Sequence, residues 1–234
     1  MNAPPAILWD IDGTLLRAKG AGVTAFIDAL TTVTGLDFPT GDMDMGGRTD
    51  PDIARRILHF AGAIGDHDEL STRLLTEMAA VYLAREAEFA GRTAALPGVV
   101  DALSALRDLD ALQTVVTGNI EPVARMKLTA AALVEHLLLD VGGYGSDHHE
   151  RAELVHIAMR RIEDTHRPVD RAHTWIVGDT PRDLACARAA GVRCVLVATG
   201  THSLESMIDL GADAVLPDLA DLDRLLDLIT PARR

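Results

Sequence analysis

Short apolar runs alternate with stretches of helical periodicity along most of the chain, and this alternation constrains the fold more than any other feature of the sequence. The runs are Ala6–Asp10, Leu112–Thr117, Leu137–Val141, Thr174–Val177, Arg193–Val197 and Ala214–Leu216. Strands that alternate with helices usually form a parallel sheet covered by helices. We therefore expect an α/β fold with a Rossmann-like parallel sheet at its core.

One stretch interrupts this alternation. Between about Arg17 and Arg92 no run resembles a buried strand, and Gly22–Val33, Pro51–Ala61 and Glu69–Phe89 carry helical periodicity instead. A block of this length exceeds an ordinary strand-to-helix connection. We predict a catalytic core formed by residues 1–16 and 93–234, with residues 17–92 inserted as an α-helical cap above the strand ends.

Composition excludes several classes of protein. The 234 residues are 48% hydrophobic, enough for a sizeable core, and 35 acidic against 22 basic side chains give a net charge of −13. An acidic chain of this kind is not expected to bind nucleic acid or an anionic membrane surface. No apolar run approaches the roughly 18 residues of a membrane-spanning helix. The first ten residues do not resemble a signal peptide. Two cysteines, Cys186 and Cys194, fit a reduced, cytoplasmic protein.

The first apolar run ends in a pair of acids, Asp10 and Asp12, followed by Gly13. Strand residues two apart point to the same side, so both carboxylates can face one cleft. Two close carboxylates repel each other and need a cation or a shared proton. Hard oxygen ligands favour Mg²⁺. The structural alternative is an ordinary polar turn after a strand.

Two other strand ends carry polar groups. After the fourth run, Asp179 emerges at the strand end and Asp183 follows one helical turn later, so the two would complete an oxygen-rich site. The second run ends in Thr117-Gly118-Asn119, where a hydroxyl, backbone N–H groups and a helix N-terminus favour an anion. Ordinary helix capping is the alternative for both segments. Since parallel sheets gather such groups at one edge, all of these residues can meet in space.

Taken together, these motifs resemble the haloacid dehalogenase superfamily of hydrolases, in particular its phosphoglycolate-phosphatase-like branch with a helical cap. Asp10-Ile11-Asp12-Gly13-Thr14 matches the DxDGT signature, Thr117 the second motif, and the segment from Gly178 to Asp183 the GDxxxD motif. The resemblance implies a Mg²⁺-dependent phosphatase that hydrolyses a small phosphorylated metabolite. It implies that Asp10 is the nucleophile, which becomes an aspartyl-phosphate, and that Asp12 is the general acid and base.

The resemblance also implies the ligands. Mg²⁺ would be held by Asp10, the backbone carbonyl of Asp12, Asp179 and Asp183. The phosphoryl oxygens would be held by Thr117, the Gly118 N–H, Asn119 and a cation.

That cation is where the sequence departs from the family, whose third motif usually supplies a lysine after the third strand. No lysine follows Lys127 in this chain. We expect Arg151 to take the role, because a guanidinium pairs well with carboxylate and phosphate together. Lys127 is expected to be a solvent-facing helical lysine. Arg48, in a Gly-rich turn of the predicted cap, is a candidate contact for an anionic part of the substrate.

Two other functions remain open at this stage. A sugar phosphomutase would share the Asp10/Asp12 pair, and a non-catalytic phosphate-sensing module also combines strand-end acids with a threonine and a basic residue. The sequence does not indicate which phosphate ester is bound, nor the oligomeric state.

Overall fold

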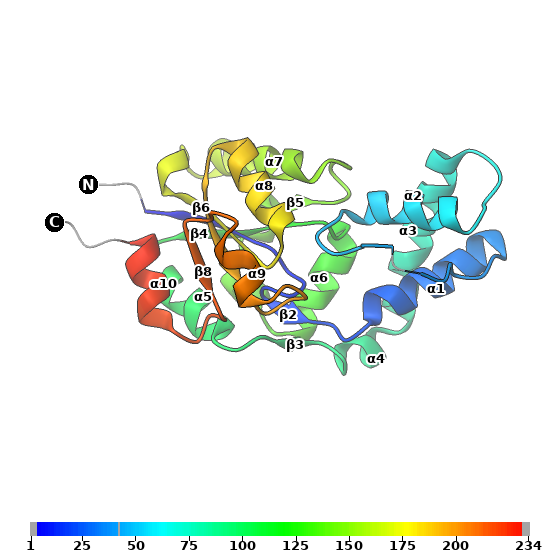
Figure 1. The fold of residues 1–234 in the computed structure, drawn as a ribbon, viewed down its shortest axis with the longest axis horizontal. Coiled ribbons are helices and arrows are strands. Elements are labelled where there is room, and N and C mark those ends of the chain that lie inside the picture. The colour runs from blue at the N-terminus through cyan, green and yellow to red at the C-terminus, as the bar shows by residue number, and fades with distance from the viewer. Residues whose placement is uncertain (1–3, 42, 231–234) are drawn as a thin grey trace.

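A computed structural model describes residues 4–41 and 43–230. A six-stranded sheet in the order β5-β4-β1-β6-β7-β8 forms the core, and every adjacent pair is parallel. These strands are β1 (Ala6–Trp9), β4 (Leu112–Thr117), β5 (Gly143–Tyr144), β6 (Thr174–Gly178), β7 (Arg193–Val197) and β8 (Ala214–Leu216). The predicted Rossmann-like α/β fold is confirmed (Figure 1).

Helices cover both faces of the sheet, because the strands carry apolar side chains on both faces. Along β1, Ile7 and Trp9 pack on one side with α5 (Val99–Asp108), α6 (Glu121–Ala130) and α10 (Leu222–Ile229). Leu8 packs on the other side with α7 (Arg151–Thr165), α8 (Pro181–Ala190) and the short α9 (Leu204–Ile208). Cys186 and Cys194 lie in this second layer as free, buried residues. No described helix is long and apolar enough to span a membrane.

One predicted strand is wrong. The run Leu137–Val141 contains the short 3₁₀ helix η2 (Leu139–Val141), which follows another, η1 (Val134–His136), and the edge strand β5 begins only at Gly143. A third 3₁₀ helix, η3 (Arg171–His173), precedes β6. The alternating burial of the run, with Leu137, Leu139 and Val141 inside, is real. A 3₁₀ turn beside β4 satisfies the same pattern of burial, so the pattern alone does not specify a strand.

The helical insertion lies between β1 and β4. We define it as α1 (Ala21–Thr34), α2 (Asp50–Phe60), α3 (His67–Ala84) and α4 (Glu86–Ala90). Figure 1 shows α1, α2 and α3 beside the core as a separate group of helices. The long helix expected from Glu69 to Phe89 is interrupted at Arg85, whose guanidinium pairs with Glu88 and Asp28. Apolar periodicity continues through the break and does not reveal it.

The chain enters and leaves the insertion through adjacent segments. Strand β2 (Leu16–Arg17) pairs in antiparallel fashion with β3 (Ala94–Ala95). These two short strands lie within one residue or two of the predicted cap boundaries. The division into two domains stays a prediction, and residues 1–3 and 231–234 of the predicted core lie outside the described residues.

Candidate active site

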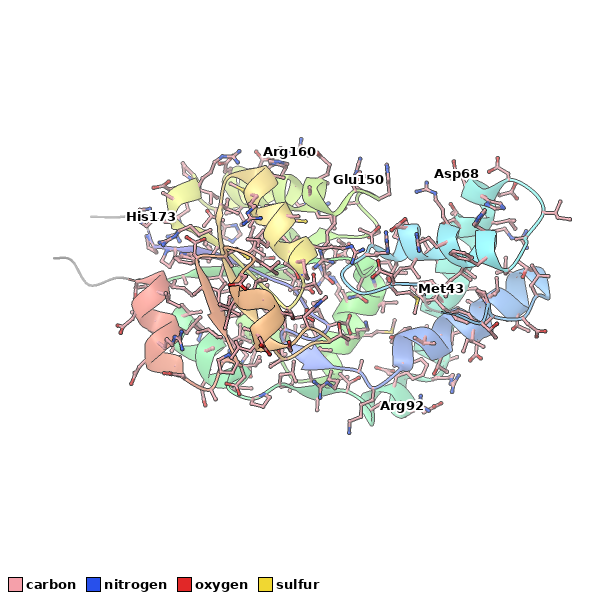
Figure 2. All side chains as sticks on the ribbon, viewed as in Figure 1. Met43, Asp68, Arg92, Glu150, Arg160 and His173 are labelled. Atoms are coloured by element: carbon pink, nitrogen blue, oxygen red, sulfur yellow. The ribbon has the colours of Figure 1, made fainter. Side chains whose placement is uncertain are left out.

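The predicted site residues meet where the carboxyl ends of the strands face the insertion. In Figure 2, His173, which precedes β6, marks the far end of the core, and Glu150, which precedes α7, lies at the end nearer the insertion. A cavity of about 630 Å³ opens between the two parts. Its walls include Asp10, Asp12, Arg48, Thr117, Gly118, Asn119, Arg151 and Asp179. Asp183 is buried and does not line the cavity.

One half of the site, which we call the Arg151 side, consists of Arg151, Asp10, Asp179 and Asp183. Arg151 is the first residue of α7, and its side chain is buried. Its Nη2 lies 2.8 Å from Asp10 Oδ1 and 2.7 Å from Asp183 Oδ1, so one nitrogen joins two carboxylates. Arg151 Nε is also buried and has no hydrogen-bond partner among residues 4–41 and 43–230.

The carboxylates of this side are costly to ionise together. Burial raises the pKa of Asp10 to about 6, although Arg151 opposes the shift. Burial, together with the charges of Asp10 and Asp183, raises the pKa of Asp179 to about 8. Ligand oxygens of these three acids lie within 4.8 Å of one another. Such a group of buried hard oxygens fits a divalent cation such as Mg²⁺, which would relieve the repulsion.

A hydrogen bond from Thr14 and two closely packed glycines hold Asp179 in place. Thr14 Oγ1 donates to Asp179 Oδ1 over 3.3 Å. A Cβ atom built on Gly13, which has a φ of +84°, would lie 2.4 Å from Asp179 Oδ2, and one on Gly200 would lie 1.6 Å away. Only glycine fits at either position. Gly200 was missed from the sequence, although it follows a strand in the same way as Gly13.

Asp183 combines two roles in one carboxylate. Its Oδ2 accepts from the Thr180 N–H at 3.0 Å and from Thr180 Oγ1 at 2.7 Å, forming a capping box at the start of α8. Its Oδ1 faces Arg151. The capping alternative considered for this motif is therefore observed, and it leaves one oxygen directed to the Arg151 side.

The other half, the Lys127 side, consists of Lys127, Asp12, Asn119 and Thr117. Here the expectation for Lys127 is wrong. The side chain is only 6% exposed, and its Nζ lies 2.6 Å from Asp12 Oδ2 and 2.7 Å from Asn119 Oδ1. Lys127 follows the buried Val123 by four residues on α6, and residues at this spacing share a helix face. That spacing was the signal that could have placed Lys127 inside.

Asn119 links the members of the Lys127 side. Its Nδ2 donates to Asp12 Oδ2 at 2.7 Å and to Thr117 Oγ1 at 2.8 Å. Asp12 Oδ2 therefore receives hydrogen bonds from an ammonium and an amide at once. Thr117 itself is fully buried at the end of β4.

The backbone of the insertion contacts the segment Thr117-Gly118-Asn119. The Asp50 N–H donates to the Gly118 carbonyl at 2.7 Å, and Asp50 Oδ2 accepts from the Ile120 N–H at 2.8 Å. A Cβ atom on Gly118 would lie 2.0 Å from the Arg48 carbonyl oxygen. Glycine at 118 is thus required for the insertion to approach this closely.

Arg48 lines the cavity, but its guanidinium is already engaged. Nη1 lies 2.7 Å from Asp52 Oδ2, and Nη2 lies 3.1 Å from Asp44 Oδ2. Nε donates to the Asp44 carbonyl at 2.6 Å.

Comparison with known proteins assigns the family. The chain is 31% identical over 232 residues to a plasmid-encoded protein of Cupriavidus necator named phosphoglycolate phosphatase, with 97% of this chain and 94% of the relative covered. The chain belongs to the haloacid-dehalogenase-like hydrolases. A family model described as HAD-hydrolase-like matches residues 151–222 of this hydrolase, a segment that contains Arg151, Asp179 and Asp183.

Further similarities agree with the motifs. The hydrolase is 29% identical to a phosphoglycolate phosphatase of Rhodospirillum rubrum, with 97% of this chain and 93% of the relative covered. Its fold is similar to that of the solved structure of CbbY from Rhodobacter sphaeroides in complex with phosphate, with a TM-score of 0.70 at 21% identity and coverage of 94% and 96%. The family resemblance predicted from the motifs is confirmed.

Proposed function

We propose that the hydrolase is a Mg²⁺-dependent phosphatase that cleaves a small phosphorylated metabolite through an aspartyl-phosphate at Asp10. The observation that carries this proposal is the meeting of Asp10 with Arg151 and two further acids, Asp179 and Asp183, at the cavity that Asp12 also lines. The names of the relatives support phosphoric monoester hydrolysis, and phosphoglycolate is one candidate substrate.

The metal would be held on the Arg151 side. Asp10, Asp179 and Asp183 offer closely spaced carboxylate oxygens, and the backbone carbonyl of Asp12 would complete the set. Bound Mg²⁺ supplies positive charge that keeps the acids ionised and offsets the charge of the phosphoryl oxygens.

The chemistry divides into two displacements. An Asp10 carboxylate oxygen attacks phosphorus, the P–O bond to the alcohol breaks, and Asp12 donates a proton to the departing oxygen. Asp12 then takes a proton from a water molecule that attacks the aspartyl-phosphate, releasing inorganic phosphate and Asp10. The Asp12 side chain is 44% exposed, which gives it access to both the leaving oxygen and water.

Charge and hydrogen bonds would hold the phosphoryl group during both steps. Thr117, Gly118, Asn119 and Arg151 line the same cavity as Asp10, and Arg151 Nε has no hydrogen-bond partner among the described residues. Phosphoryl transfer depends mainly on such positioning and electrostatics. Lys127 would hold Asp12 in place, and Arg48 would border the substrate from the insertion.

The proposal is tested by phosphate release from 4-nitrophenyl phosphate. Asp10→Asn should reduce turnover to background, because an amide is a poor nucleophile, and chelation with EDTA should do the same until Mg²⁺ is restored. Circular dichroism would verify that the variant is folded. Turnover that persists in either case would overturn the mechanism.

The same assay separates the alternatives. Isomerisation of a hexose phosphate without free phosphate would indicate a phosphomutase. A stable aspartyl-phosphate with negligible hydrolysis would indicate a phosphate-sensing module.

A further inference from the structure

The cavity is large, and part of its wall is apolar. Side chains from the insertion and from α6 form this apolar wall: Val23, Phe26, Ile53, Met78 and Val123. Phe26, Met78 and Val123 are buried. Cavities of about 300–1,000 Å³ accommodate organic ligands of drug size. A volume of about 630 Å³ exceeds what a phosphoryl group with a two-carbon acid needs.

Within this wall lies a hydroxyl, that of Tyr82, whose proton has no acceptor among the described residues. Tyr82 is 2% exposed, and the polar group that it interacts with, the Lys127 ammonium, can only donate. Burial raises the pKa of Tyr82, so the hydroxyl keeps its proton and can donate. An unsatisfied buried hydroxyl costs about 1–3 kcal/mol, and proteins seldom tolerate one without a reason.

Tyr82 is placed on the leaving-group side of the proposed reaction. It lies close enough to Lys127 for the two groups to interact electrostatically, and Lys127 in turn holds Asp12. The alcohol oxygen that receives a proton from Asp12 would therefore leave toward Tyr82 and the apolar wall.

The cations of the cavity do not offer a buried site for a carboxylate at this end. Arg48 is paired with Asp44 and Asp52, and Lys127 and Arg151 are paired with site acids. Arg17 and Lys19 are exposed and line the cavity where the chain enters the insertion, and Arg17 Nη2 donates to the Thr199 carbonyl at 2.7 Å. An acidic substrate would have to rely on such exposed cations, whereas the buried surface beside Asp12 is apolar with one hydroxyl.

We infer that the hydrolase takes a phosphate monoester whose alcohol part is larger than glycolate, mainly apolar, and carries a hydrogen-bond acceptor for Tyr82 Oη. This inference rests on the proposed function and specifies its substrate class. The apolar wall would bury the alcohol part, and Tyr82 would orient it while Asp12 protonates the ester oxygen.

The test uses the full chain with Mg²⁺ and measures phosphate release from three kinds of ester. These are 2-phosphoglycolate, phenyl phosphate, and methoxyphenyl phosphates with the ether oxygen at each ring position. We expect kcat/KM for the best methoxyphenyl ester to exceed that for 2-phosphoglycolate by at least about tenfold. Tyr82→Phe should lower kcat/KM for that ester relative to phenyl phosphate by about three- to tenfold.

Tyr144→Phe is the matched control. The Tyr144 hydroxyl donates to the Leu139 carbonyl and does not line the cavity, so its loss should leave the ratio between esters unchanged. Because the ratio is measured within each variant, partial unfolding does not alter it.

Two results would overturn the inference and leave the proposed function intact. One is a preference for 2-phosphoglycolate that Lys19→Ala abolishes, and the other is an unchanged ester ratio in Tyr82→Phe. The proposed function itself would fail, and the inference with it, if no ester released phosphate or if Asp10→Asn were as active as the wild type.

Discussion

The acids on the two sides of the site are neutralised in different ways. On the Arg151 side, one guanidinium nitrogen joins Asp10 and Asp183, while Asp179 keeps a raised pKa beside them. On the Lys127 side, one ammonium and one amide converge on a single oxygen of Asp12. The first half has more acids than it can neutralise and so calls for a metal. In the second, Lys127 pairs with Asp12 directly.

This difference separates two tasks. An incompletely neutralised group of acids attracts a cation and, through it, a phosphate. An acid held through one oxygen keeps its position and leaves its other oxygen available, which suits a group that must deliver and recover a proton. Removing either cation should therefore damage the reaction in a different way.

The largest effect is expected from Arg151→Ala. It leaves Asp10 and Asp183 without their shared partner and removes a donor to the phosphoryl group, so kcat/KM should fall by about 10³-fold or more. The fall should be equal for esters with good and poor leaving groups, because the phosphoryl group is common to both. Arg151→Lys serves as the charge-preserving control. A variant with near-normal kcat/KM would remove Arg151 from the phosphate site.

Lys127→Met should have a smaller and more selective effect. The methionine keeps the length of the side chain but releases Asp12, so proton delivery to the leaving oxygen becomes less efficient. We expect about a 10²-fold loss of kcat for an alkyl phosphate and a much smaller loss for 4-nitrophenyl phosphate, whose leaving group needs little help. Equal losses for both esters would mean that Lys127 contacts the phosphoryl group instead.

The effect of Mg²⁺ on stability also distinguishes the Arg151 side from the Lys127 side. Saturating Mg²⁺ should raise the free energy of unfolding by about 1–3 kcal/mol, as measured by thermal or urea denaturation. Asp179→Asn should abolish this stabilisation, whereas Lys127→Met should retain it, because the proposed metal ligands lie on the Arg151 side. Loss of the Mg²⁺ effect in Lys127→Met would contradict the assignment of metal binding to the Arg151 side.

The smallest effect concerns the acid that the insertion brings to the Lys127 side. Burial raises the pKa of Asp50 to about 6 from an ordinary value of 3.8. Between these values the folded state holds a proton that the unfolded state has lost, so the contribution of Asp50 to stability falls as pH rises through this window.

Asp50→Asn removes this titration but keeps an oxygen for the Ile120 N–H. The stability of the variant relative to wild type should therefore increase by about 1–3 kcal/mol between about pH 4 and about pH 7. Urea denaturation across this range provides the measurement. A constant difference would show that Asp50 does not titrate there.

Much of the fold and site was predictable from sequence because strand ends in a parallel sheet converge. The acids and Thr117 were identified from their positions after apolar runs, with no knowledge of contacts. The failures share a cause: apolar periodicity reports burial, not backbone hydrogen bonding. It led to the prediction of a strand where the structure has the 3₁₀ helix Leu139–Val141, and it did not reveal the helix break at Arg85.

Side-chain direction was the other limit. Lys127 was expected outside because lysine is usually solvated, yet its position on α6 relative to Val123 faces it inward. Tyr82 and Asp50 lie in the insertion, outside the motifs at the strand ends. Their place in the site depends on how the insertion docks, which no local pattern encodes.

The pairing of β2 with β3 has a consequence beyond the present chain. Because the two connections between core and insertion lie side by side, the residues between them form one continuous segment whose two ends are neighbours in space. If the insertion selects the alcohol, as proposed, exchanging that segment between related hydrolases alters which alcohol is accepted and leaves the acids of the sheet untouched. Selectivity and chemistry can then diverge at different rates, since different segments of the chain carry them.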